Sequence, residues 1–110
     1  MTPDDDALWD VPLDEVPLAF LDLEMTGCDP ANDRICEIAI HRVVRGAVVE
    51  RLASLVDPAT PVGASADIHH IDDESLRGAP TLAELGPAIE RALGGAVPVG
   101  HAVSFDLAFL

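Results

Sequence analysis

Lysine is absent from this chain of 110 residues, and its six cationic side chains are all arginines, set against 20 aspartates and glutamates. A formal net charge of −14 argues against the basic stripe with which proteins bind duplex phosphates. Six of the acids lie in the first sixteen residues, so residues 17–110 carry 14 acids and a formal charge of −8. Strong phosphate-driven binding would therefore need positive charge from metal ions or from elsewhere.

Long hydrophobic runs and paired cysteines are missing as well. No run approaches the ~20 apolar residues of a membrane span, and the acidic first residues argue against a secretory signal. The two cysteines, Cys28 and Cys36, lack the spacing of a zinc site or a disulfide framework. We therefore expect reduced thiols, no membrane partner and a cytoplasmic location.

The hydrophobic content of 49% suits a single domain or a large piece of one. Residues 1–16 are expected to form an acidic, flexible lead-in. Its one large apolar residue, Trp9, is expected to dock on the domain, with a partner-binding handle as the alternative. Folded structure is expected to begin at residue 17.

Three strands are expected in the first half of the folded portion, from residue 17 to about 25, from 35 to 44 and from 47 to 56. Arg45-Gly46 is a turn signal, so the last two strands form a hairpin. Residues 26–33 are dense in turn formers, which predicts a loop. The three strands together predict an antiparallel meander with one face that needs a cover.

Helical signals follow in the second half. Thr81-Leu82-Ala83-Glu84 matches a capping box, and apolar residues then recur at helical spacing as far as Gly94-Gly95. This pattern predicts an amphipathic helix that covers the sheet, with Pro87 expected to bend it or delay its start. Residues 97–100 predict a short strand, and Ser104 is expected to cap a second helix that the end of the sequence interrupts.

Two carboxylates interrupt the first expected strand. Successive side chains of a strand point to opposite faces, so Asp22 and Glu24 project from the same side. Two ionised carboxylates in a largely dry setting either share a proton or hold a cation, and Mg²⁺ or Mn²⁺ suits such oxygen ligands. The alternative is an edge strand whose acids face water.

Two other polar patterns favour structural roles. Asp72-Asp73-Glu74 repeats the D-x-E spacing in a polar stretch, where Asp72 can cap a helical turn. His69-His70 has no third cysteine or histidine nearby at ligand spacing, so loop packing is favoured over a metal site.

Four blocks of the sequence, in the same order and at similar spacing, resemble the DnaQ-like, DEDD-type 3′–5′ exonucleases. The blocks run from Phe20 to Gly27, from Asp33 to Ala39, from Ile68 to Asp72 and from Gly100 to Asp106. This family includes the proofreading epsilon subunit of bacterial DNA polymerase III, ribonuclease T and oligoribonuclease. Each block is weak by itself, but four in register across residues 17–110 are specific.

The resemblance implies an α/β, RNase H-like mixed sheet, in which the antiparallel three-stranded meander is joined by a parallel fourth strand and flanking helices. Residues 17–110 are then the N-terminal portion of an exonuclease domain. Asp22, Glu24 and Asp106 match the family's catalytic acids, which hold two divalent metal ions, Mg²⁺ or Mn²⁺. The residues implied in substrate binding are Met25, Thr26, Gly27, His101 and Phe105.

For the complete protein, the resemblance implies a metal-dependent 3′–5′ exonuclease that releases nucleoside 5′-monophosphates from single-stranded DNA or RNA ends. DNA proofreading or repair is the expected setting, with a DNA polymerase subunit as a further partner. The alternative is a catalytically incomplete, exonuclease-derived binding or interaction module.

The chain departs from the family pattern in three places. Ala102 stands where asparagine is common, and His70 and Asp72 stand where glycine and threonine are usual. The third motif, which supplies a general-base histidine and the last metal-binding aspartate, lies beyond residue 110. Residues 1–110 alone are therefore expected to be inactive, and to expose apolar surface at the C-terminal edge.

Overall fold

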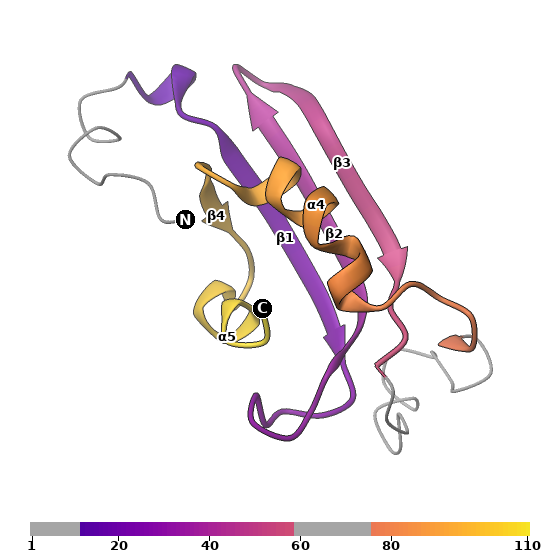
Figure 1. Ribbon diagram of the computed structural model, residues 1–110. Coiled ribbons are helices and arrows are strands. Elements are labelled where there is room, and N and C mark those ends of the chain that lie inside the picture. Colours follow the sequence, from indigo (N-terminus) through magenta and orange to yellow (C-terminus); the bar gives the residue numbers. More distant parts are fainter. Residues whose placement is uncertain (1–11, 59–75) are drawn as a thin grey trace.

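The computed structural model describes residues 12–58 and 76–110, which form one sheet with helices against it (Figure 1). The strand order is β3-β2-β1-β4. The strands are β1 (Leu18–Met25), β2 (Ile35–Val44), β3 (Ala47–Leu55) and β4 (Val97–Val99), and the helices are η1 (Leu13–Glu15, 3₁₀), α4 (Leu82–Leu93) and α5 (Val103–Leu107). The first three strands are antiparallel neighbours and β4 lies parallel to β1, so the predicted mixed sheet is confirmed.

The β2–β3 hairpin turns through the two residues expected from the sequence. Arg45 and Gly46 have φ values of 53° and 77°. Positive φ at both central residues is the requirement of the two-residue turn whose twist matches that of paired strands. Nearby, Arg45 forms an ion pair of 2.7 Å with Glu15 of η1, which ties the start of the described chain to this turn.

The two faces of the sheet differ in character. On one face Leu21 and Leu23 of β1 are buried with Ile38 and Ile40 of β2, and α4 covers them through Ala92 and partly buried apolar side chains. The other face, which we call the open face, carries Phe20, Asp22 and Glu24 of β1 opposite His41, Ala39 and Glu37 of β2. Strand alternation thus sorts the apolar residues under α4 and leaves the acids on the open face.

Helix α4 begins where the capping box predicts. The Thr81 hydroxyl accepts a hydrogen bond from the Glu84 N–H at 3.2 Å, and the Glu84 carboxylate accepts one from the Thr81 N–H at 3.3 Å. The expectation that Pro87 delays the helix start is wrong, because the helix runs from Leu82 through Pro87. Pro87 has no N–H to donate to the Ala83 carbonyl. Because Ala83 is exposed, a water molecule can donate that hydrogen bond instead.

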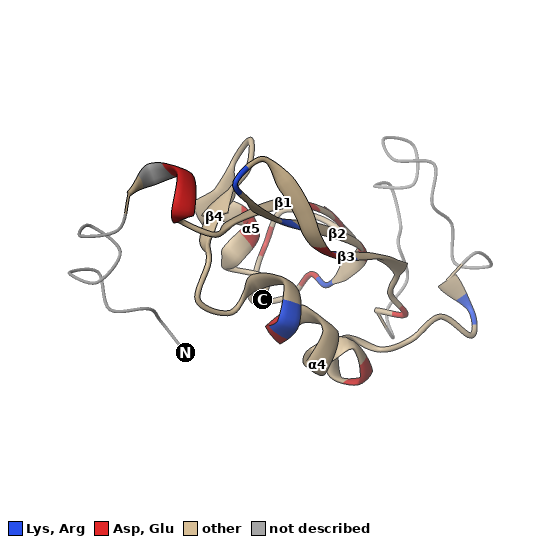
Figure 2. Ribbon diagram, turned by 90° about the horizontal axis from the view of Figure 1, so that it is seen from above, with Lys and Arg blue, Asp and Glu red and all other residues tan. Residues whose placement is uncertain are grey.

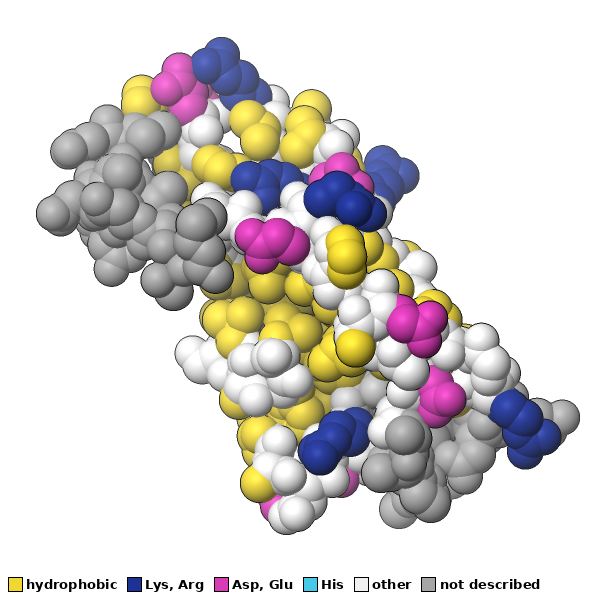
Figure 3. Space-filling view, viewed as in Figure 1, with side chains coloured by type: hydrophobic (Ala, Val, Ile, Leu, Met, Phe, Trp, Pro, Cys, Tyr) yellow, Lys and Arg dark blue, Asp and Glu magenta, His cyan; other side chains and the backbone are white. Residues whose placement is uncertain are grey.

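Helix α5 begins earlier than the sequence suggested. Its N-cap is Ala102, and the Asp106 N–H donates to the Ala102 carbonyl at 3.0 Å. Ser104 lies inside the helix, so its expected role as N-cap is wrong: the chain turns into the helix directly after β4. Figure 3 shows hydrophobic side chains gathered around α5 and between α5 and α4.

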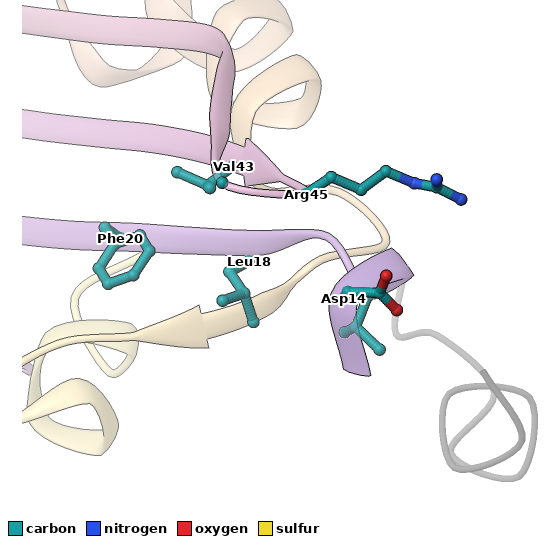
Figure 4. Close-up of a pocket in the computed structure, with 7 residues that line it drawn as sticks. Asp14, Leu18, Phe20, Val43 and Arg45 are labelled. Atoms are coloured by element: carbon teal, nitrogen blue, oxygen red, sulfur yellow. The ribbon is translucent and has the colours of Figure 1, made fainter. Parts of the chain in front are cut away.

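The open face is apolar at the start of β1. A groove of about 350 Å³ lies there, lined by Leu18 and Phe20 of β1 and Val43 of β2, with Asp14 and Arg45 at its edges (Figure 4). Val16, just before β1, is buried.

Several expectations concern residues outside the described ranges, namely Trp9, His69, His70 and the Asp72–Glu74 repeat. Within residues 12–58 and 76–110, no helix is long and apolar enough to cross a membrane.

Candidate active site

Asp22 and Glu24 project from the second half of β1 onto the open face. Their neighbours Leu21 and Leu23 point the other way and are buried under α4, which fixes the orientation of the strand. A shift of one residue would bring the acids into the core, so the buried leucines specify which way the carboxylates face. The predicted pair on one face is therefore present, but Asp22 is exposed and Glu24 half-buried, so the expected dry setting is wrong for Asp22.

A β-bulge lies beside Glu24. Glu24 pairs with Glu37 and Met25 with Ile35, so Cys36 is the extra residue of β2. Its thiol donates a hydrogen bond to the Glu24 carbonyl at 3.4 Å. Burial, and then the nearby Glu24 and Glu37 carboxylates, raise the pKa of Cys36 to about 11, so the thiol remains a donor at neutral pH. Bulges commonly re-aim side chains beside active sites, and this one adjoins a proposed ligand.

The third predicted acid arrives from the opposite end of the sequence. Strand β4 pairs with β1 only as far as Val99, opposite Phe20, and α5 then contacts β1. The turn passes so close to β1 that a Cβ atom on Gly100 would lie 2.9 Å from the Leu21 carbonyl oxygen. Glycine therefore lets the chain bring Asp106 to the strand that carries Asp22.

Asp106 is a buried acid, with 8% of its surface exposed. Burial, followed by the nearby Asp22 carboxylate, raises the pKa of Asp106, while His101 acts in the opposite direction. Among the described residues, none donates a hydrogen bond to its side chain. A buried carboxylate opposed by a second one is stabilised by a proton or a cation, and the oxygen ligands suit a hard divalent ion.

The structure brings together Asp22 and Asp106, and places Glu24 on the same strand and face as Asp22. Within the described part of the chain, however, no group of three or more His, Cys, Asp or Glu side chains is arranged to hold a metal ion. A single site built from all three acids therefore stays a prediction.

Two polar side chains that the sequence reasoning did not assign share this face. Glu37 lies directly opposite Glu24, and His41 directly opposite Phe20. His41, Phe20 and Asp22 also line a groove of about 230 Å³, together with Val99 and Gly100. The alternation of β2, combined with the register that its hairpin sets, was the signal that could have placed them.

The residues predicted to contact substrate occupy three places. Thr26 and Gly27 begin the loop after β1, while Met25 is partly buried against the core. His101 is exposed in the turn before α5, and Phe105 packs edge-on against Phe109 with ring centroids 5.3 Å apart. Their role in binding remains a prediction.

Comparisons with known proteins agree on one family. The model of the RNase_T family, described as an exonuclease, matches residues 19–110. A DNA polymerase III subunit epsilon-like protein of Rhodobacter capsulatus is 39% identical over 108 residues, which cover 94% of this chain and 15% of that protein. The chain thus spans a small part of the length of this relative.

Solved exonucleases share the fold. Exonuclease X in complex with 5′ overhanging duplex DNA aligns with a TM-score of 0.67 at 29% identity, covering 84% of this chain and 53% of that one. A metal-free complex of E. coli ExoI with single-stranded DNA gives a TM-score of 0.73 at 20% identity, covering 86% and 23%. The second likeness shows the fold alone, and together they confirm the expected RNase H-like architecture.

Proposed function

Because this chain belongs to the RNase_T family of DnaQ-like exonucleases, we propose that the protein containing it is a metal-dependent 3′–5′ exonuclease. Its substrate is the single-stranded 3′ end of DNA or RNA, from which it releases nucleoside 5′-monophosphates. Asp22, Glu24 and Asp106 are the catalytic acids of this proposal.

The observation that carries the proposal is the position of Asp106. A buried carboxylate beside a second carboxylate costs free energy in a folded protein unless a proton or a cation compensates it. Asp106 is buried, and the Asp22 carboxylate is near enough to raise its pKa further, although the two residues come from opposite ends of the described chain. A buried acid whose pKa is raised in part by an acid from a distant part of the chain is typical of functional sites.

The donor chemistry of these residues fits divalent ions, because carboxylate oxygens are the ligands that Mg²⁺ and Mn²⁺ prefer. Asp22, Glu24 and Asp106 would hold them. If two such ions were bound, they would supply an activated water and charge stabilisation for the leaving 3′-oxygen of a phosphodiester. The chain's own contribution is to fix the carboxylates: the buried leucines orient β1, and Gly100 lets α5 approach it.

The surface charge supports the same dependence on metal. Figure 2 shows arginine positions scattered among acidic ones over the sheet and α4, with no basic stripe along the described residues. Arg42 and Arg45 are engaged in contacts within the fold, with the Gly94 carbonyl at 2.6 Å and with Glu15. Phosphates would therefore be repelled by the acidic end of the open face until cations bind there.

Recognition of a strand end through backbone and shape, instead of base identity, suits this arrangement. The Thr26–Gly27 segment directly after β1 is proposed to contact the terminal nucleotide, with His101 and Phe105 on the α5 side. The name of the Rhodobacter relative favours a DNA polymerase subunit as a further partner.

The test replaces Asp22 with alanine in the full-length protein, not in residues 1–110 alone, and follows the shortening of a 5′-labelled single-stranded oligonucleotide with Mg²⁺, with Mn²⁺ and with chelator. Turnover should fall by on the order of 10²-fold or more, since groups that stabilise transition-state charge contribute at least that much. Asp14→Ala, at the other end of the open face, is the matched control and should keep full activity. An Asp22→Ala variant with an unchanged rate would refute the site, and binding without shortening by the parent would favour the interaction module.

A further inference from the structure

The loop between β1 and β2 is held in one shape by the side chain of Asp33. One carboxylate oxygen accepts the Thr26 hydroxyl at 3.0 Å, and the other accepts the Asp29 N–H at 2.9 Å. The Thr26 oxygen in turn accepts the Arg34 N–H at 3.0 Å. The Thr26 N–H donates to the Arg34 carbonyl at 2.8 Å, so both ends of the loop are joined.

These bonds decide which groups of the Thr26–Gly27 segment can meet a ligand. The hydroxyl proton and the N–H of Thr26 are both engaged within the loop. The N–H and the carbonyl of Gly27, in contrast, make no hydrogen bond to any residue that the structure describes. Gly27 therefore presents an unpaired backbone donor and acceptor two residues beyond Met25, at the end of the strand that carries Asp22 and Glu24.

Asp33 also explains why residue 27 is glycine. A Cβ atom there would lie 2.5 Å from one Asp33 carboxylate oxygen and 2.7 Å from its carboxyl carbon. The carboxylate cannot move away without losing its bonds to Thr26 and Asp29. The bare backbone of Gly27 and the anchored carboxylate of Asp33 thus depend on each other.

The carboxylates of this loop accept hydrogen bonds from other residues of the same loop. The Asp29 carboxylate accepts the Ala31 N–H at 3.0 Å and the Asn32 side-chain amide at 2.6 Å. The Asn32 bond and then the Ala31 bond lower the pKa of Asp29. The role of these acids is therefore to shape the backbone, a role that differs from that of Asp22.

We propose that Asp33 is a positioning residue that preshapes the Thr26–Gly27 segment, so that the Gly27 backbone groups receive the 3′-terminal nucleotide. This inference rests on the proposed exonuclease function and names a residue that contacts neither the substrate nor the catalytic acids. A segment held in its bound shape before binding loses less conformational freedom on binding, which strengthens affinity.

The test compares Asp33→Ala, Asp33→Asn and Asn32→Ala in the full-length protein used for the Asp22 test, by KM and kcat on a single-stranded oligonucleotide and by Kd for ends carrying a 3′-hydroxyl or a 3′-phosphate. Loss of two hydrogen bonds should raise KM and Kd for the 3′-hydroxyl end about tenfold and leave kcat within about twofold. Asn32→Ala removes a loop bond that does not reach Thr26 and should leave KM unchanged. Asp33→Asn keeps one acceptor oxygen, so its KM and Kd should lie between those of the parent and those of Asp33→Ala.

A second pair of variants tests the dependence directly. Gly27→Ala should raise KM strongly in the parent and much less in the Asp33→Ala background, where the colliding carboxylate is gone. The inference would be overturned if Asp33→Ala left KM unchanged, if Asn32→Ala raised KM as much as Asp33→Ala does, or if Asp33→Ala lowered kcat alone. In each of these cases an active parent would still uphold the exonuclease function. A parent that neither shortens the strand nor distinguishes the two ends overturns both.

Discussion

Replacing Gly100 with alanine tests whether close approach to β1 is what holds Asp106 in place. The new Cβ would lie 2.9 Å from the Leu21 carbonyl oxygen, whereas an ordinary contact begins at about 3.4 Å. The obstructing atom belongs to the backbone of a strand that is paired with β2 at Leu21 and with β4 up to Phe20, so it cannot rotate away. The turn must therefore move outward by roughly 0.5 Å, taking α5 with it.

The expected cost follows from that displacement. Overpacking of this kind destabilises a protein by about 1–3 kcal/mol. In a domain of this size, each kcal/mol lowers the melting temperature by roughly 4–8 °C. Catalytic groups tolerate only about 0.5 Å of displacement, so turnover should fall about tenfold or more even in the fraction that remains folded.

The assay combines urea unfolding, thermal melting and turnover on the same preparations. Gly86→Ala is the matched control, because Gly86 lies inside α4 and, its chain neighbours and the helix backbone aside, no atom lies within 4 Å of the added Cβ. The gain of about 0.5–1 kcal/mol from removing a helix glycine is opposed by the new Cβ meeting the ring of Pro87, so the variant should stay within about 1 kcal/mol of the parent and leave turnover unchanged. A Gly100→Ala variant as stable and as active as the parent would show that the spacing between the turn and β1 does not position Asp106.

Two further predictions concern titratable groups. Asp106→Asn should make the metal-free protein more stable at pH 7. The raised pKa of Asp106 means that its protonated form, present below the ordinary value of 3.8, suits the fold, and this stability is lost as pH rises through the folded-state pKa and the acid ionises. Urea unfolding with chelator at pH 7 and near pH 3.5 checks this, and an equal advantage at both pH values would contradict it. A thiol reagent at pH 8 should label one cysteine quickly, the exposed Cys28, and the buried Cys36, with its pKa of about 11, only after unfolding. Rapid labelling of two thiols in the folded protein would be inconsistent with the packing of β2.

The sheet could be predicted from local signals because they act over short distances. The turn residues Arg45 and Gly46 and the alternation of β1 and β2 place all three antiparallel strands to within a residue or so. The start of α5 could not be predicted, since Ser104 is a better cap by type than Ala102. Tertiary structure sets the helix start: the close turn at Gly100 after β4 directs the backbone into helical conformation from Val103.

The same contrast applies to the candidate site. The D-x-E spacing was enough to place Asp22 and Glu24 on one face, because strand period is a local property. That Asp106 comes near Asp22 could be expected only from resemblance to a family, since no local pattern relates residues so far apart. The positions of Glu37 and Asp33 depend on the register of the hairpin and on the path of a loop, which sequence periodicity does not encode.

The parallel pairing of β4 with β1 has a consequence for the order in which the site assembles. It consists of three residue pairs, one of them at Pro98, which has no N–H to donate. The β1–β2–β3 hairpins close over short stretches of chain, whereas β4 must return from the far end of the sequence, and such long-range closure is slow. An early folding species can therefore hold Asp22 and Glu24 in their final places while Asp106 is still remote. In the native state, brief detachment of β4 and α5 would move Asp106 away from Asp22 without disturbing the meander. If the proposed cations bind there, their residence time would therefore be tied to the lifetime of the short β4–β1 pairing.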